Sequence, residues 1–260
     1  MEQEQHQQPT DARARNILPF AAVLAVAIIV GAWAYSARMD AVPAADGGVQ
    51  AQASDPFQNA EGEIPLGDLG VRLVKDGVID MEKLAAVYAG RGGLPPEMRA
   101  LLETPDAASL TLTPENAGVA LNLLWAFGLS NQNRILTEGP MSQTQYGGAE
   151  NFASTGGWTL AVGNAMNHYS AHPFVELTAS QQMLVERVAK TIYRPCCNNS
   201  TYFPDCNHGM AMLGLLEILA ANGVSEPEVY RRALAVNALW FPDAYATIGT
   251  YLAQYGKRID

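Results

Sequence analysis

The sequence predicts an all-α protein, with a single N-terminal transmembrane helix followed by a compact extracytoplasmic domain of about seven helices. Three observations support this fold class. One uncharged apolar run lies near the N-terminus. Later segments repeat the order of a capping residue, apolar residues at helical spacing and a terminating glycine or proline. Only residues 109–112 suggest a short β segment.

The N-terminal quarter, residues 1–62, is not expected to belong to the folded domain. Residues 1–16 are polar and rich in glutamine, which predicts a disordered cytoplasmic tail. Residues 17–35 carry no charge, and a helix of that length spans roughly 30 Å, the thickness of the hydrocarbon layer. Trp33 and Tyr35 stand at its end, where aromatic rings favour the membrane interface. This run predicts a membrane anchor.

The charges around the anchor predict its orientation. Arg13 and Arg15 precede it, whereas only Arg38 follows closely, so the N-terminus is expected in the cytoplasm and the domain in the periplasm or outside the cell. A cleaved signal peptide is the competing interpretation, because small residues follow the run. The apolar run exceeds the usual core of a signal peptide, which favours an uncleaved anchor. Both interpretations export residues 36–260.

Two further regions complete the predicted organisation. Residues 36–62 are rich in Ala, Gly, Asp and Gln, which predicts a flexible stalk. Residues 63–260 form the helical extracytoplasmic domain and are numerous enough for one core. The net charge of −10 argues against nucleic acid as a partner. The partners to consider are the membrane and another envelope protein.

The helices of the domain follow from their caps and stops. Asp80, Thr113, Thr178 and Ser225 are expected N-caps. The segments with a helical pattern are residues 81–88, 97–103, 114–128, 158–170, 179–193, 210–221, 226–239 and 244–255. Two of them, around 114–128 and 209–221, have little polar surface and are expected at the centre of the domain.

Residues 131–157 form the longest segment without a clear pattern and contain several Gly-Gly or Gly-Pro pairs. A connection of this length inside a domain is often functional. An ordered surface loop is the alternative, and it is the interpretation we favour from sequence.

All three cysteines lie within residues 196–206, between two predicted helices. Asp205 is the expected N-cap of the second helix, which would place Cys206 at its first position and His208 at its third. A thiol at a helix start, near the positive end of the dipole, is stabilised as thiolate. Arg194 would act in the same direction on the two adjacent cysteines.

The leading hypothesis is a metal site formed by Cys196, Cys197, Cys206 and His208. Such soft sulfur and nitrogen ligands favour copper or zinc. The pattern Cys-Cys-x8-Cys-x-His matches no standard zinc module, and adjacent cysteines rarely both reach one ion without strain. Two or three sulfurs with His208 are therefore expected as ligands. Met210 and Met212 lie on different helix faces, so at most one could contribute, and packing in the core is the favoured role.

Two alternatives remain open at this stage. Export favours a disulfide from Cys206 to Cys196 or Cys197, worth about 2–3 kcal/mol, in a structural or interaction domain of the envelope. One cysteine would then be left over and able to exchange with the bond. A thiol-dependent redox enzyme with Cys206 as nucleophile is the third hypothesis, so the sequence leaves enzymatic activity undecided.

Two further histidines, His168 and His172, are four residues apart and would share one helix face. Pro173 is expected to end that helix, so ordinary histidines are favoured over metal ligands. The sequence contains no P-loop, Gly-x-Gly-x-x-Gly, Gly-x-Ser-x-Gly or Cys-x-x-Cys-His motif, which disfavours ATPases, dinucleotide oxidoreductases, esterases and c-type cytochromes.

Overall fold

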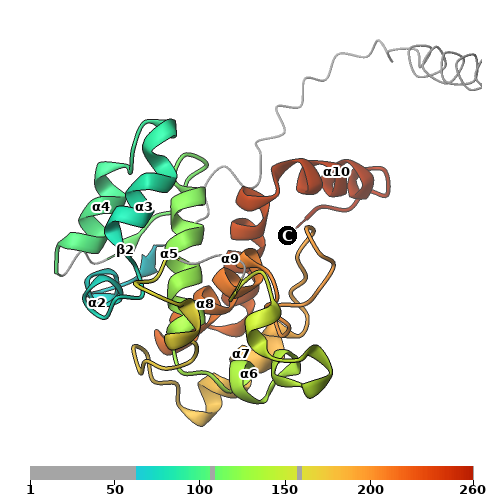
Figure 1. The fold of residues 1–260 in the computed structure, drawn as a ribbon. Helices are drawn as coiled ribbons and strands as arrows, with labels where there is room; N and C mark the ends of the chain where they lie inside the picture. Colours follow the sequence, from blue (N-terminus) through green and yellow to red (C-terminus); the bar gives the residue numbers. More distant parts are fainter. Residues whose placement is uncertain (1–62, 106–108, 157–159, 260) are drawn as a thin grey trace, which may run out of the picture. The chain divides into compact units, whose positions relative to one another are not determined.

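The computed structural model describes residues 63–105, 109–156 and 160–259, and within these ranges the protein is all-α (Figure 1). The described residues contain nine α-helices and one two-stranded antiparallel sheet: β1 (Ile64–Pro65), α2 (Leu69–Lys75), α3 (Met81–Tyr88), α4 (Pro96–Glu103), β2 (Ser109–Leu110), α5 (Ala117–Ser130), α6 (Arg134–Glu138), α7 (Ala179–Ala189), α8 (Asn207–Ala221), α9 (Glu226–Trp240) and α10 (Pro242–Ala253). The predicted tail, anchor and stalk lie outside the described residues. No helix of the described ranges is both long and apolar enough to cross a membrane.

Helices α5 and α8 form the centre of the domain, as their apolar sequences predicted. Nearly every residue of both helices is buried. Their backbones pack in direct contact because Gly128 faces Gly214: a Cβ atom on Gly128 would lie 2.2 Å from the carbonyl oxygen of Met210. Glycine is the one residue that allows this approach.

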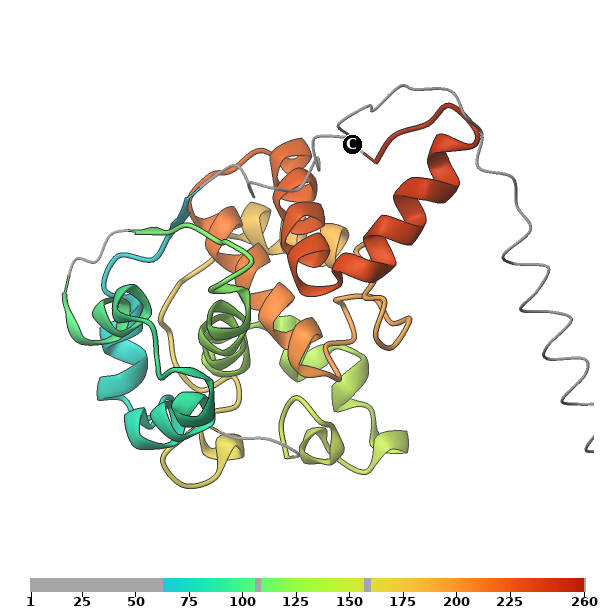
Figure 2. The same cartoon turned by 90° about the horizontal axis from the view of Figure 1, so that it is seen from above.

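The other helices cover this central pair. Helices α2, α3 and α4 lie on one side of α5, and α7 and α9 pack with α8 on the other (Figure 1). Helix α10 follows α9 after Phe241 and extends away from the central helices (Figure 2). The cysteine loop connects α7 to α8, so it lies on the side of α5 that α7, α8 and α9 cover.

Several predicted helix ends are confirmed. The side chain of Asp80 accepts hydrogen bonds from two backbone N–H groups of α3. Thr178 and Gln181 form a reciprocal capping box at the start of α7. The central helix, however, begins at Ala117 rather than at residue 114. Thr113 and Asn116 exchange side-chain-to-backbone hydrogen bonds of 2.9 and 3.3 Å, which makes Asn116 the residue before the helix.

The predicted helix at residues 158–170 is wrong in its described part, which holds a single 3-10 turn, Ala165–Asn167. Asn164 caps that turn, and Ser170 then adopts a left-handed conformation with φ of 50°. The backbone N–H of Ser170 donates to Leu129 at the end of α5 instead of to a helical partner. Helix α7 likewise ends before residue 193, because Tyr193 pairs with Ser200 in the cysteine loop.

Candidate metal centre

The cysteine loop is a tight turn closed by backbone hydrogen bonds. Tyr193 and Ser200 form an antiparallel bridge, and the N–H of Arg194 donates to the carbonyl of Asn199 at 3.1 Å. Within the turn Asn198 has a φ of 56°, a left-handed conformation that asparagine tolerates better than most residues. This turn carries Cys196 and Cys197 toward the start of α8.

The three sulfur atoms form a nearly equilateral triangle. The Sγ–Sγ distances are 3.6 Å between Cys196 and Cys197, and 3.7 Å from each of them to Cys206. All three residues are free thiols. The structure therefore brings both adjacent cysteines to Cys206, although the sequence led us to expect strain in such an arrangement.

Cys206 itself is the N-cap of α8, which corrects the expected cap at Asp205 by one position. Its Sγ accepts a hydrogen bond from the backbone N–H of Gly209 at 3.4 Å. His208 is consequently the second helical residue rather than the third. The expectation that a cysteine sulfur faces the free N–H groups of this helix is confirmed, with the sulfur in the capping role.

Two further residues, His208 and Asp205, each lie close to two of the three sulfurs. The donor atoms of Cys196, Cys206 and His208 all lie within 4.8 Å of one another, as do those of Cys197, Asp205 and Cys206. Both carboxylate oxygens of Asp205 are already engaged. Oδ1 accepts from Arg194 at 2.6 Å and Oδ2 from Asn199 at 2.8 Å. The imidazole of His208 is therefore the better fourth donor.

The ring of His208 is held between aromatic side chains. Its centroid lies 4.5 Å from that of Phe241 and 5.7 Å from that of Trp240, at the junction of α9 and α10. Burial, with a smaller effect of the positive charge of Arg194, lowers the pKa of His208. The ring is thus neutral at pH 7, the form in which imidazole binds metals.

Arg194 is the buried cation at the base of this site and is only 1 % exposed. Its guanidinium donates to the carbonyl oxygens of Ser200 and Phe203 at 2.6 and 3.0 Å. It also donates to Sγ of Cys197 at 3.2 Å and forms an ion pair with Asp205. One side chain therefore fixes the loop and one of its sulfurs together.

Space for this guanidinium depends on Gly209 in the first turn of α8. A Cβ atom there would lie 2.6 Å from Cζ of Arg194. Arg194 was expected from sequence as a neighbour of the cysteines, whereas the roles of Gly209 and Asn199 in holding it were not. A glycine at the third position of a helix is a visible signal in the sequence. It indicates space for another side chain only once the position of Arg194 is known.

The three thiols differ in their acidity. Burial alone would raise the pKa of Cys197, but the N–H of Asn199 and the guanidinium of Arg194 outweigh it and hold that pKa below its usual value. Burial, followed by the charge of Cys206, raises the pKa of Cys196 to about 12. Burial also raises the pKa of Cys206, so the expectation of a stabilised thiolate is wrong for Cys206 and Cys196 and holds for Cys197 alone. Of the three cysteines in the metal-free site, Cys197 is therefore the most readily ionised.

The long segment after α5 is ordered and covers one side of the cysteine loop. In its described part, up to residue 156, it contains α6 and three 3-10 turns. Tyr146 and Phe152 pack on Phe203 with ring centroids 5.3 Å away. The N–H of Ser154 donates to the carbonyl of Asp205, and the Ser154 carbonyl accepts from Trp125 of α5. The segment therefore ties the site to the central helix.

The remaining residues considered from sequence lie elsewhere. Met210 and Met212 are fully buried in the core, as their favoured role predicted. His168 Nδ1 and His172 Nε2 are 2.9 Å apart, and Asp76 lies 3.9 Å from the other nitrogen of His172. These histidines belong to neither group of donors around the cysteines. The fold does not bring them to the cysteine loop.

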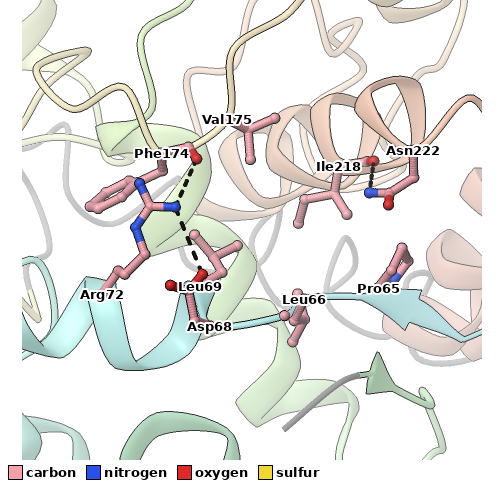
Figure 3. A pocket seen from close by; sticks show the side chains of 10 residues that line it. Pro65, Leu66, Asp68, Leu69, Arg72, Phe174, Val175, Ile218 and Asn222 are labelled. Atoms are coloured by element: carbon pink, nitrogen blue, oxygen red, sulfur yellow. Dashed lines mark hydrogen bonds and ion pairs between the residues drawn. The ribbon is translucent and has the colours of Figure 1, made fainter. Parts of the chain in front are cut away.

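A separate pocket of about 420 Å³ opens between β1, α2, the segment before α7 and α8 (Figure 3). Arg72 in its wall lies 5.1 Å above the ring of Phe174 and donates to the Phe174 carbonyl at 3.0 Å. Both Nη atoms of this cation thus already donate to backbone carbonyls of the protein itself. None of the cysteine-site residues lines this pocket.

The chain matches no protein-family model, and comparisons with curated proteins and with solved structures found no match either. Fold and site therefore define the class: an all-α domain with a cluster of three cysteines and one histidine that can hold a metal ion.

Proposed function

We propose that this chain is a membrane-anchored, extracytoplasmic protein that binds a thiophilic transition metal through Cys196, Cys197, Cys206 and His208. Of copper and zinc, we favour zinc. The observation that carries the proposal is the triangle of three free sulfurs with edges of 3.6 and 3.7 Å, next to an available imidazole.

The size of the triangle favours tetrahedral coordination. Zinc binds thiolate at about 2.3 Å, and a tetrahedron of that size has sulfur–sulfur edges of about 3.8 Å. A planar three-sulfur site with the same bond length would need edges of about 4.0 Å. The observed edges lie at the tetrahedral end. A tetrahedral ion lies outside the plane of the sulfurs and needs a fourth ligand, which His208 supplies.

The residues around the sulfurs favour an ion bound by several thiolates. Three thiolates and one Zn²⁺ carry a net charge of −1, and the buried guanidinium of Arg194 lies against one of these sulfurs. Asp205 and Asn199 in turn hold the loop around that guanidinium. Outer contacts of this kind orient metal ligands and tune their affinity.

The membrane part of the proposal comes from residues 17–35 and from the stalk-like composition of residues 36–62. A domain tethered in this way would exchange its metal with another envelope protein or with the medium. The full chain should resist extraction from membranes at high pH, whereas a chain lacking residues 17–35 should be released. Release of the intact full chain would contradict the anchor.

The metal site is tested with reduced, metal-free protein titrated with zinc. We expect one zinc per chain by elemental analysis, and a Co²⁺ form with the absorption of a tetrahedral thiolate site. The variants His208→Ala and Cys206→Ser should each weaken zinc binding by more than about 10-fold, a loss that even outer-shell changes produce. His168→Ala is the matched control and should bind normally. A stoichiometry and affinity unchanged by both site variants would refute the proposal.

A further inference from the structure

The three sulfurs of the cluster are not held equally. Cys206 is fixed at the start of α8 by the N–H of Gly209, and Cys197 is held by the buried guanidinium of Arg194. Among the interactions of the described residues, the sulfur of Cys196 contacts only the other two sulfurs, and Cys196 is the exposed member. The sulfur of Cys196 can therefore move with the smallest loss of hydrogen bonds to the rest of the protein.

Distance alone does not select a disulfide, because both candidate pairs with Cys206 are 3.7 Å apart. A disulfide needs about 2.05 Å, so one sulfur must move by more than 1 Å. If Cys197 moved, it would leave Arg194, whose Nε already lacks a partner among the described residues. Arg194 would keep its ion pair with Asp205, but each hydrogen bond that a buried charged group loses is costly. If Cys196 moved, no such contact would be lost.

The adjacent pair is the least suited to a disulfide. Cα atoms joined by a trans peptide are about 3.8 Å apart, which is shorter than the 4.4–6.8 Å usual across a disulfide. A bond between Cys196 and Cys197 would therefore require a distorted backbone in the turn.

We infer that the cluster is a redox switch: oxidation joins Cys196 to Cys206, leaves Cys197 as a thiolate against Arg194, and releases the bound metal. The inference rests on the proposed metal function. After oxidation only Cys197 and His208 remain as ligands, and a zinc site normally needs four.

The reaction balances with a low-molecular-weight disulfide as oxidant. The Cys197 sulfur attacks one sulfur of the reagent, breaks its S–S bond and expels one small thiolate. Cys206 then attacks the Cys197 sulfur and expels the second small thiolate. Finally Cys196 attacks the Cys206 sulfur, and Cys197 leaves as a thiolate that returns to Arg194. The protons of Cys196 and Cys206 pass to the two small thiolates, so one reagent disulfide becomes two thiols.

This order agrees with the contacts of each sulfur. The most stabilised thiolate is the best leaving group in thiol exchange, and Cys197 is the sulfur that a buried cation contacts. The last step also needs little movement, because Cys196 already lies 3.7 Å from the sulfur that it attacks. An oxidising environment would thus empty the site without unfolding the domain, whose core is formed by α5 and α8.

The test uses oxidised glutathione on the reduced protein, with and without bound zinc. After alkylation with N-ethylmaleimide, intact mass should show one modified thiol, and fragmentation between the adjacent cysteines should place it on Cys197. Zinc captured by a chromophoric chelator should appear in a 1:1 ratio to the disulfide. A main product in which Cys197 is bonded, or zinc that stays bound after the disulfide forms, would overturn the switch.

Two cysteine variants test the order of the exchange steps, and zinc binding by the reduced protein separates the switch from the metal function. Cys197→Ser should form the same Cys196–Cys206 bond but more slowly, whereas Cys196→Ser should stop at a Cys197–Cys206 bond. A reduced protein that binds no zinc contradicts the metal function, and the switch with it. A protein that binds zinc but forms another disulfide contradicts the switch alone.

Discussion

Arg194 places its guanidinium Nη2 atom 3.2 Å from the sulfur of Cys197, although its side chain is almost completely buried. A buried cation is expensive unless it is paired, and here a carboxylate, two carbonyl groups and a sulfur share it. The same contact orders the turn and sets the chemistry of one cysteine. A substitution of Arg194 should therefore change both the conformation of the loop and the reactivity of Cys197.

Alkylation of the reduced, metal-free protein should separate the cysteines by pH. Because the pKa of Cys197 is lowered, its iodoacetamide reaction should reach half its maximal rate below about pH 8.5, the usual thiol value. Cys196, with a pKa of about 12, should react with iodoacetamide mainly above pH 10. Residue-specific mass spectrometry over pH 6–10 provides the measurement. Equal profiles for the two cysteines would contradict the assigned role of Arg194.

Replacing Arg194 should raise the midpoint for Cys197. In Arg194→Gln the cation is lost and Asp205 is left without its ion pair, so a loss of about 3–5 kcal/mol of stability is expected as well. Arg194→Lys is the control because it keeps a positive charge without the planar fork. Its Cys197 profile should lie between those of the wild type and the glutamine variant, and urea unfolding should give the same order of stability.

A methyl group at Gly209 should disrupt the site. In Gly209→Ala the new Cβ would meet Arg194 at 2.6 Å, so the guanidinium must move, at a cost of about 1–3 kcal/mol, and zinc affinity should fall. Gly118→Ala is the matched control, since it also lies in the first turn of a helix but has no atom within 4 Å. That change should stabilise the protein by up to about 1 kcal/mol. Chemical unfolding and zinc titration of both variants decide the matter.

The contact between the central helices gives a test of the fold. A Cβ atom on Gly214 would lie 2.5 Å from the carbonyl oxygen of Leu124, which cannot rotate away as a side chain could. Gly214→Ala should therefore push α5 and α8 apart and lower the free energy of unfolding by about 1–3 kcal/mol or more. A neutral or stabilising effect would mean that the two helices do not pack at this distance.

These glycines show how far the sequence predicts the fold. Apolar composition identified α5 and α8 as central, and short-range caps such as Asp80 and Thr178 were readable because their partners lie within three residues. The close approach of Gly128 and Gly214 could not be predicted from sequence, because it pairs residues far apart in the chain. Helices α2 and α6 were missed since they are only seven and five residues long.

The site was predictable in place but not in geometry. Three cysteines within a short loop located the chemistry, because their proximity is guaranteed by the chain. Asp205 looked like the helix cap, but both its oxygens are bound by Arg194 and Asn199, so Cys206 takes that role. The segment at residues 158–170 misled for a related reason: its backbone bonds to the end of α5, which no local pattern reveals.

One buried carboxylic acid should govern the pH dependence of stability. Glu217 on α8 is fully buried, and its two oxygens accept hydrogen bonds of 2.7 Å from Asn131 and Asn133. Burial raises its pKa well above the ordinary value of 4.5, more than these two bonds lower it. The folded protein therefore keeps a proton that the unfolded chain loses above pH 4.5.

The sign of the effect follows from that retained proton. The stabilisation is fully present below pH 4.5 and is lost as the pH rises through the folded-state pKa, with a slope of up to about 1.4 kcal/mol per pH unit. Glu217→Gln cannot titrate, so its free energy of unfolding should lack this slope between pH 5 and 8. It should also be lower near pH 5, because the new NH₂ group faces an asparagine donor. Glu176→Gln, at an exposed site, should keep the wild-type slope. If Glu217→Gln and the wild type run parallel in urea unfolding across this range, Glu217 is already ionised in the folded protein.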